Sequence, residues 1–218
     1  MRIKLLPILI FLVVISGCGK HDFVVSDLVC EGLVNPMGID KTSPRFSWKT
    51  SSTKNGTEQK AFQLLVASSL DLLKEGQSDL WDSGKVESAN SVFVPYQGKS
   101  LQPGFPAVWK VRIWDETGAV SAWSQPATFG IGLLSETDWK AVYIGFPTEA
   151  GYRECPQMYQ SFDVENLDSK WFLHVNSLGY HEVYLNGKKA GNGILTPAVS
   201  QFDKRSLINT YDVTSLVK

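Results

Sequence analysis

Histidine and cysteine are scarce in this chain, and each occurs three times in 218 residues. The histidines are His21, His174 and His181, and their spacing matches no metal-binding motif. Glycine-rich phosphate loops and the Gly-x-Ser-x-Gly elbow of esterases are absent as well. The sequence therefore predicts neither a metal site nor a nucleotide cofactor, and we expect His174 and His181 to be structural.

An excess of charge of one sign is also missing, because 21 Lys and Arg residues nearly balance 22 Asp and Glu residues. The formal net charge of -1 provides no basic field that would attract nucleic acid, so a nucleic-acid partner is excluded. None of the carboxylates stands in a recognisable acid–base arrangement, and each is best interpreted as solvated surface. We predict no catalytic residue in this chain.

No hydrophobic run reaches the about 20 residues that a membrane-spanning helix needs. The apolar run near the start extends from Leu5 to Ile15, is interrupted by Pro7 and follows the positive charges of Arg2 and Lys4. A short apolar run behind a positive start is typical of a signal peptide and not of a folded element.

The next residues, Ile15-Ser16-Gly17-Cys18, resemble the lipobox of bacterial lipoproteins, in which the cysteine is acylated after cleavage. Stable anchoring needs more than one acyl chain, which a lipidated N-terminal cysteine supplies. We therefore expect a lipoprotein signal peptide over residues 1–17, lipidation of Cys18, a tether over residues 18–26, and export to a bacterial membrane. An ordinary signal peptide with a chance cysteine is the alternative, and the membrane face, periplasmic or cell-surface, stays open.

The other two cysteines, Cys30 and Cys155, would lie in an oxidising compartment, where disulfides can form. They fall in different predicted domains, so we expect two separate buried thiols. A disulfide between them is the alternative.

Glycine, proline and aromatic residues are frequent, with 18 glycines, 10 prolines and 11% aromatics, which favours an all-β fold. Apolar and polar side chains alternate in the segments 46–48, 61–67, 92–96 and 109–113. Alternation with a period of two indicates strands that have one buried face and one solvated face. Turn signals separate these segments, so the sequence predicts a small antiparallel sandwich.

The string Leu101-Gln102-Pro103-Gly104, followed by alternating Trp109, Val111 and Ile113, resembles the late strands of a fibronectin type III domain. The resemblance has one departure, because Ala107 stands where such domains usually place a corner tyrosine that hydrogen-bonds the backbone. The string Ser121-Ala122-Trp123-Ser124 resembles the tryptophan–serine bulge near the last strand of some members. We therefore expect Arg112 or Lys110 to stack on the indole ring of Trp123.

Tryptophan is abundant, with seven residues, and an exposed indole ring is a surface on which sugar rings stack. Core packing is nevertheless the favoured interpretation for most of them, because Trp48 and Trp109 lie on predicted buried faces. Trp81 and Trp114 each precede an aspartate, and their role is left open.

Several longer strings carry a family resemblance when they are read in order. They lie at residues 35–40, 44–48, 66–69, 80–86, 109–115 and 132–141. Over residues 27–218 the chain resembles the N-terminal region of bacterial α-L-rhamnosidases of glycoside hydrolase family 78. The resemblance implies an all-β chain with a fibronectin type III-like sandwich at 27–132 and the start of the family's N-terminal jelly-roll domain at 138–218.

Strand patterns in the second region support part of this expectation. Alternation is visible at residues 139–143, 162–164 and 172–175. An Asn-Gly pair at 186–187 lies between apolar runs and predicts a hairpin with a type I′ turn. A jelly roll needs about eight strands, and only five or six candidates follow residue 138, so we expect a truncated domain with an open edge and an uncovered apolar face.

The resemblance also implies a function for a longer protein, namely inverting hydrolysis of terminal α-L-rhamnose from glycans. In that family an (α/α)6 barrel supplies the catalytic acid and base, and the chain alone is expected to be inactive. Some relatives bind rhamnose and calcium in the jelly roll, but neither ligand maps onto residues here, and Ala198-Val199 replaces a common glycine–tryptophan pair. The alternatives are a free-standing lipoprotein that binds carbohydrate or protein, and an inactive gene remnant.

Overall fold

The computed structural model describes residues 23–104, 106–145 and 157–218. The predicted signal peptide, Cys18 and Cys155 lie outside these ranges. Strands dominate the described residues, and the helical elements among them are two short 3-10 turns, η1 (Glu136–Asp138) and η2 (Thr214–Leu216). None of the described helices has the length and hydrophobicity that crossing a bilayer requires. The all-β fold class is confirmed.

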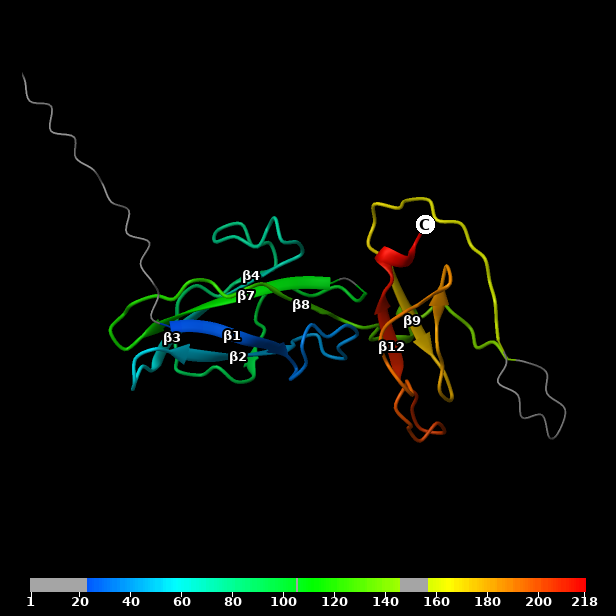
Figure 1. The fold of residues 1–218 in the computed structure, drawn as a ribbon, viewed down its shortest axis with the longest axis horizontal. Helices are drawn as coiled ribbons and strands as arrows, with labels where there is room; N and C mark the ends of the chain where they lie inside the picture. Colours follow the sequence, from blue (N-terminus) through cyan, green and yellow to red (C-terminus); the bar gives the residue numbers. More distant parts are fainter. Residues whose placement is uncertain (1–22, 105, 146–156) are drawn as a thin grey trace, which may run out of the picture.

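The first domain is a sandwich of two antiparallel sheets (Figure 1). One sheet has the order β1-β2-β6, formed by β1 (Phe23–Cys30), β2 (Arg45–Ser52) and β6 (Val94–Pro95). The other has the order β4-β3-β7-β8, formed by β4 (Trp81–Asp82), β3 (Gln59–Ala67), β7 (Pro106–Asp115) and β8 (Ala127–Gly130), with β5 (Val86–Glu87) also paired with β3.

Aromatic side chains fill the space between the two sheets. Phe46 of β2 and Trp109 of β7 are fully buried, with ring centroids 4.4 Å apart, and Phe129 of β8 lies 5.3 Å from Phe46. Trp48 packs edge-to-face on Phe62 at 5.2 Å. The inward faces predicted at 46–48 and 109–113 are therefore confirmed, whereas Val92 is 57% exposed and both faces of β3 are buried over 61–67. Burial of such rings supplies the main stabilising free energy of the domain.

The first strand begins earlier than the sequence suggested, inside the predicted tether at 18–26. Phe23 and Val25 are 4% and 6% exposed, and they belong to the core. Phe23 pairs with Ser52 of β2, so residues 23–26 form strand and not tether. The alternating apolar side chains at positions 23 and 25 explain this correction, because they give β1 one buried face.

A tyrosine does fasten the corner of the sandwich, although it is not at position 107. Ala107 is buried, and Tyr96, directly after β6, donates its hydroxyl hydrogen bond to the carbonyl of Lys99 at 2.7 Å. The same hydroxyl lies 3.3 Å from the carbonyl of Leu80. A β-carbon on Gly98 would lie 2.5 Å from that hydroxyl, so this turn requires glycine for close approach.

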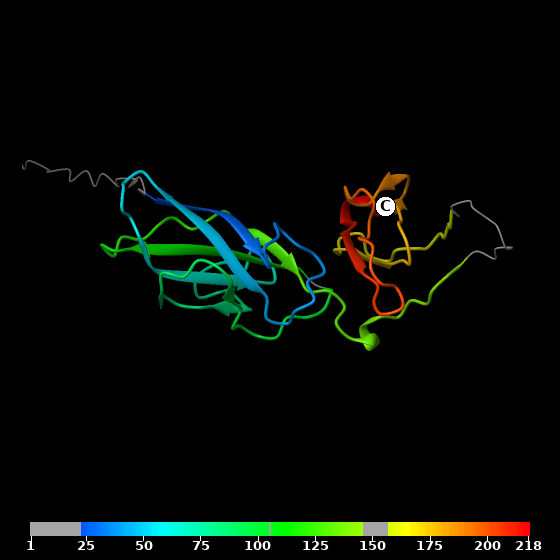
Figure 2. The ribbon, with the colours of Figure 1, turned by 90° about the horizontal axis from the view of Figure 1, so that it is seen from below.

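The second region contains two small sheets (Figure 2). β9 (Phe172–Asn176) pairs with β12 (Ile208–Asp212), and β10 (Tyr184–Leu185) pairs with β11 (Lys188–Lys189). Asn186 and Gly187 have φ values of 50° and 77°, so the predicted type I′ hairpin is confirmed.

Two other predicted strands of this region do not form. Residues 139–143 and 162–164 have no strand hydrogen bonding, and Tyr143 and Phe162 are 67% and 62% exposed. Alternation selects a face for burial, but a strand also needs a neighbouring strand to satisfy its backbone groups. The described residues provide no such neighbour for these segments.

Candidate functional surfaces

Glu31 is a structural carboxylate of the first domain. Glu31 accepts hydrogen bonds from the backbone N of Arg45 at 2.8 Å and from its Nη2 at 2.7 Å, and Lys41 Nζ lies 3.2 Å away. The hydrogen bond from the Arg45 side chain lowers the pKa of Glu31 to about 2. The general acid of a glycosidase needs a raised pKa, so this environment is unsuited to that role.

The pKa values of three further carboxylates are also lowered. A hydrogen bond from the Thr117 hydroxyl lowers the pKa of Asp115, and a hydrogen bond from the Ser135 backbone lowers the pKa of Asp138. A hydrogen bond from Lys189 lowers the pKa of Glu182. These groups stabilise turns and a hairpin. In the described ranges, no cluster of three or more His, Cys, Asp and Glu side chains is arranged to hold a metal ion.

Both described histidines fasten the β9–β12 sheet. His174 Nδ1 lies 2.9 Å from Oγ1 of Thr210, across the strand pair. His181 bridges two side chains, with Nδ1 2.7 Å from Ser177 Oγ and Nε2 3.0 Å from the Tyr211 hydroxyl. Burial lowers the pKa of His174 and of His181, which favours the neutral ring that such bridges use. The contacts fit the structural role expected for these residues.

Basic side chains of β7 and Lys85 lie over tryptophan rings on the outer face of the larger sheet. The Arg112 guanidinium lies 4.5 Å from the ring centre of Trp123 and 5.1 Å from that of Trp114. Lys110 lies 4.8 Å from Trp123, and Lys85 lies 5.4 Å from Trp114. The predicted stacking on Trp123 is confirmed, and both candidate cations take part.

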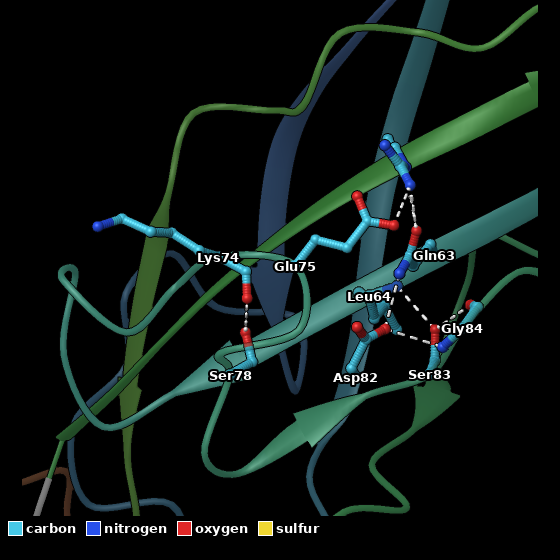
Figure 3. Close-up of polar contacts among 9 residues, drawn as sticks. Gln63, Leu64, Lys74, Glu75, Ser78, Asp82, Ser83 and Gly84 are labelled. Atoms are coloured by element: carbon cyan, nitrogen blue, oxygen red, sulfur yellow. Dashed lines mark hydrogen bonds and ion pairs between the residues drawn. The ribbon is translucent and has the colours of Figure 1, made fainter.

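The same arginine is fixed by hydrogen bonds to neutral and acidic neighbours. Arg112 donates to Gln63 Oε1 at 2.7 Å and to Glu75 Oε1 at 2.8 Å. Gln63 in turn donates to Asp82 Oδ1 at 2.7 Å, and Figure 3 shows Glu75, Gln63 and Asp82 converging from three segments. Gln63 and Glu75 belong to the same domain as Arg112, so these contacts form a polar network that joins segments of this sheet face.

The second region differs from the first in how much apolar surface it exposes. We call the following exposed side chains the apolar surface: Val142, Tyr143, Ile144, Met158, Tyr159, Phe162, Leu167, Leu178, Tyr180, Tyr184, Ile194, Leu195, Val199, Phe202, Leu207 and Ile208. Beyond residue 138 the buried apolar side chains in the described part are Ala190, Pro197 and Val213. An apolar surface of this extent is typical of a region that another polypeptide covers.

One pocket opens at the edge of the first sandwich, and sequence patterns did not reveal it. Its volume is about 210 Å³. The lining residues are Phe62, Trp81, Val86, Ser88, Asn90, Val94, Pro95 and Gln97. These residues come from β3, β4, β5, β6 and the loops beside them, so only the folded sandwich brings them together. The one available signal was Trp81, whose role the sequence left open.

Two family models match the chain, and they follow the two structural regions. Residues 25–135 match the Rha78A-like N-terminal immunoglobulin domain. Residues 169–218 match the α-L-rhamnosidase N-terminal domain. The first match covers the two-sheet sandwich, and the second covers the β9–β12 sheet and the hairpin.

Known proteins with similar chains are α-L-rhamnosidases. One from Formosa agariphila is 38% identical over 202 residues, which are 83% of this chain and 21% of the relative. The structure of an α-L-rhamnosidase from Dictyoglumus thermophilum is 33% identical with a TM-score of 0.77, covering 89% of this chain and 24% of that one. A Streptomyces avermitilis α-L-rhamnosidase, solved with L-rhamnose, is 30% identical with a TM-score of 0.56, covering 90% of this chain and 21% of that one.

The shares covered show that the chain spans less than a quarter of the length of these relatives. Within that span the likeness extends over both regions of the fold, and the immunoglobulin-like model alone covers about half of the chain. The chain belongs to the α-L-rhamnosidase family, glycoside hydrolase family 78, and corresponds to the N-terminal region of its members.

Proposed function

We propose that this chain is the non-catalytic N-terminal portion of a longer exported α-L-rhamnosidase, which hydrolyses terminal α-L-rhamnose from glycans. The observation that carries the proposal is the match of both regions to the N-terminal domains of proteins named α-L-rhamnosidase, at about a fifth of their length. The carboxylates of Glu31 and Glu182 form ion pairs, and those of Asp115 and Asp138 stabilise turns, which agrees with a non-catalytic role.

The supporting role follows from the contrast between the two regions. The first domain has a closed aromatic core and is complete in itself. The second exposes its apolar surface, and its strands β9 and β12 each have one unpaired edge in the described part. We propose that the following polypeptide pairs with these edges and covers the apolar surface, so that the chain carries a catalytic barrel.

A comparison of two protein products tests this function. The 218-residue chain and a version extended by the downstream coding sequence are incubated with an aryl α-L-rhamnoside. We expect release of the aryl group by the extended protein and none by the shorter chain, since the catalytic acid and base would belong to the extension. Turnover by the purified 218-residue chain would contradict the proposal, and so would a downstream sequence that encodes no hydrolase.

We further propose that the protein is exported and held at a bacterial membrane by acylation of Cys18. The resemblance of Ile15-Ser16-Gly17-Cys18 to a lipobox supports this proposal. Mass spectrometry of the membrane fraction tests it, with a diacylglyceryl modification expected on Cys18. Recovery of an unmodified protein that behaves like its Cys18→Ser variant would overturn it.

A free-standing carbohydrate- or protein-binding lipoprotein was the alternative from sequence. It receives less support, because the likeness to α-L-rhamnosidases continues through the second region to residue 218. A free-standing module would also have to tolerate the apolar surface of that region in water.

A further inference from the structure

The pocket at the open edge of the first sandwich has an apolar floor. Phe62 and Val94 are buried at its base, and Trp81 and Val86 are half-buried beside them. The Trp81 ring packs edge-to-face on Tyr96, with ring centres 5.3 Å apart. Because Tyr96 is fixed by its own hydrogen bonds, the indole ring that lines the pocket has a defined position.

Neutral polar side chains surround this floor. The Ser88 hydroxyl oxygen accepts a hydrogen bond from the backbone N of Asn90, and Asn90 Oδ1 accepts one from Val92. These contacts leave the Ser88 hydroxyl proton and the Asn90 side-chain amide nitrogen available. The Gln97 amide has no hydrogen-bond partner among the described residues. The pocket therefore offers hydrogen-bond donors and an acceptor at its mouth, without any ionisable group.

The mouth of the pocket is held in place from both sides. On one side, Gln59 Nε2 donates to the backbone carbonyls of Ser88 and Asn90, at 3.1 and 3.0 Å. Trp48 Nε1 donates to Gln59 Oε1 at 3.0 Å, which fixes the glutamine from the core. The polar groups on this side are thus positioned before any ligand arrives, which lowers the entropy that binding costs.

The other side of the mouth is equally constrained. The backbone N of Lys99 donates to the carbonyl of Leu80 at 3.0 Å, which joins the segment of Gln97 to the segment of Trp81. Gly98 lies so close that an added β-carbon would be 2.5 Å from Cβ of Trp81. Gln97 is therefore presented beside the indole ring by a turn that has little freedom to move.

The volume of the pocket and the charge of its lining residues restrict the size and the charge of the ligand. Drug-sized ligands occupy pockets of roughly 300–1,000 Å³, so a pocket of about 210 Å³ accommodates one small ring and not an oligomer. The absence of ionisable lining groups favours an uncharged ligand, because a buried unpaired charge is costly. An apolar floor with free amide and hydroxyl groups at the mouth matches a ring that has an apolar face and hydroxyl groups at its edge.

We propose that this pocket is a binding subsite for a single neutral sugar residue at the end of a glycan, held against Trp81 and hydrogen-bonded by Gln97, Asn90 and Ser88. We choose rhamnose, a neutral deoxy sugar, as the ligand. This choice rests on the proposed function, because an enzyme acting on rhamnosylated glycans would meet such residues. The subsite lies in the immunoglobulin-like domain and would retain the glycan near the enzyme without taking part in bond cleavage.

The test is a titration of the full 218-residue chain with methyl α-L-rhamnopyranoside, followed by chemical shifts of backbone amides. We expect changes concentrated at residues 81–97 and a dissociation constant in about the millimolar range, since one ring buries little area. Gluconate and cyclohexanol serve as comparison ligands, one charged and one without the set of hydroxyl groups, and both should bind at least about tenfold more weakly.

Three variants separate binding at the pocket from a general effect. Gln97→Ala removes the exposed amide and should weaken binding about five- to tenfold, the effect of one lost hydrogen bond. Gln77→Ala, an exposed glutamine in a different loop, should leave binding unchanged. Trp81→Phe keeps a ring against Tyr96 but reduces the area of the pocket wall, and it should weaken binding in a variant whose amide spectrum shows that it is folded.

Three results would overturn the subsite: no shift changes at tens of millimolar rhamnoside, equal binding of cyclohexanol, or equal loss in Gln97→Ala and Gln77→Ala. The failure of this inference is distinguishable from failure of the proposed function. Hydrolysis by the extended protein together with an empty pocket rejects only the subsite. A bound rhamnoside with no hydrolysis by the extended protein rejects only the enzymatic role.

Discussion

A β-carbon on Gly38, in the first domain, would lie 2.8 Å from Oγ1 of Thr210 in β12 of the second. Thr210 itself is held by the 2.9 Å contact to His174. Gly38 also crosses Gly132, where an added β-carbon would be 3.1 Å from the Gly38 carbonyl. The two domains therefore meet at a point where only glycine leaves enough room, which explains the glycine within the family string Asn35–Asp40.

This close approach predicts that Gly38→Ala destabilises the protein in two ways. The φ of +82° at Gly38 costs an alanine about 1–2 kcal/mol, and the overlap with Thr210 adds roughly 1–3 kcal/mol. Gly56→Ala is the matched control, because Gly56 has a φ of +79° and no neighbour within 4 Å. Urea denaturation of both variants measures the difference.

Because Thr210→Ala removes Oγ1 but also its contact to His174, the comparison is a double-variant cycle: Gly38→Ala should cost less in a Thr210→Ala background than in the parent protein. The strain of φ should persist, since it does not depend on the neighbour. Equal destabilisation by Gly38→Ala and Gly56→Ala, with the same cost of Gly38→Ala in both backgrounds, would show that the contact between domains is not tight.

The hydroxyl of Tyr96 predicts a second stability effect. Tyr96→Phe removes the hydrogen bond to the Lys99 carbonyl in a partly buried corner, which should cost about 1 kcal/mol of the free energy of unfolding. Tyr180→Phe, at a tyrosine that is 58% exposed, should be neutral. Urea denaturation at neutral pH compares the two, and a neutral Tyr96→Phe would reject the corner interpretation.

Alkaline pH provides an independent reading of the same residue. Burial raises the pKa of Tyr96 from 10.0 to about 12 and the pKa of the Cys30 thiol from 9.0 to about 12. Both protonated groups favour the folded state fully at neutral pH, and this contribution is lost as pH rises through the window from 9 to 12. The loss should be shallower in Tyr96→Phe, as followed by fluorescence during alkaline titration.

Acid pH should weaken the protein through Glu31. The hydrogen bond from Arg45 lowers the pKa of Glu31 from 4.5 to about 2, so the ionised carboxylate stabilises the folded state above pH 4.5. That contribution is lost as pH falls from 4.5 toward 2. Glu31→Gln should be less stable at pH 7 and should lose less stability on acidification. Parallel pH profiles for the two proteins would contradict this assignment.

Alternation predicted the faces of the first domain well, because Phe46, Trp48 and Trp109 each occupy an inward position in a paired strand. The turn at Asn186-Gly187 was predictable for a local reason, since an Asn-Gly pair tolerates positive φ at both positions. The strand at 23–26 was missed because the adjacent lipobox suggested a tether.

Features that depend on several distant segments were not predictable from local patterns. The corner role of Tyr96 depends on carbonyls of Leu80 and Lys99, and the pocket beside Trp81 depends on loops that Gln59 fixes. Alternation at 139–143 failed as a strand prediction because pairing is decided by neighbouring strands and not by side-chain order.

The central claim is that the following polypeptide covers the apolar surface and pairs with the free edges of β9 and β12. Hydrogen exchange at these two strands tests it. Amides of Phe172–Asn176 and Ile208–Asp212 are compared between the 218-residue chain and the protein extended by its downstream sequence, with β3 and β7 amides as internal references. We predict at least about tenfold slower exchange at β9 and β12 in the extended protein, and unchanged exchange in β3 and β7. Equal exchange at β9 and β12 in the two proteins would contradict the claim.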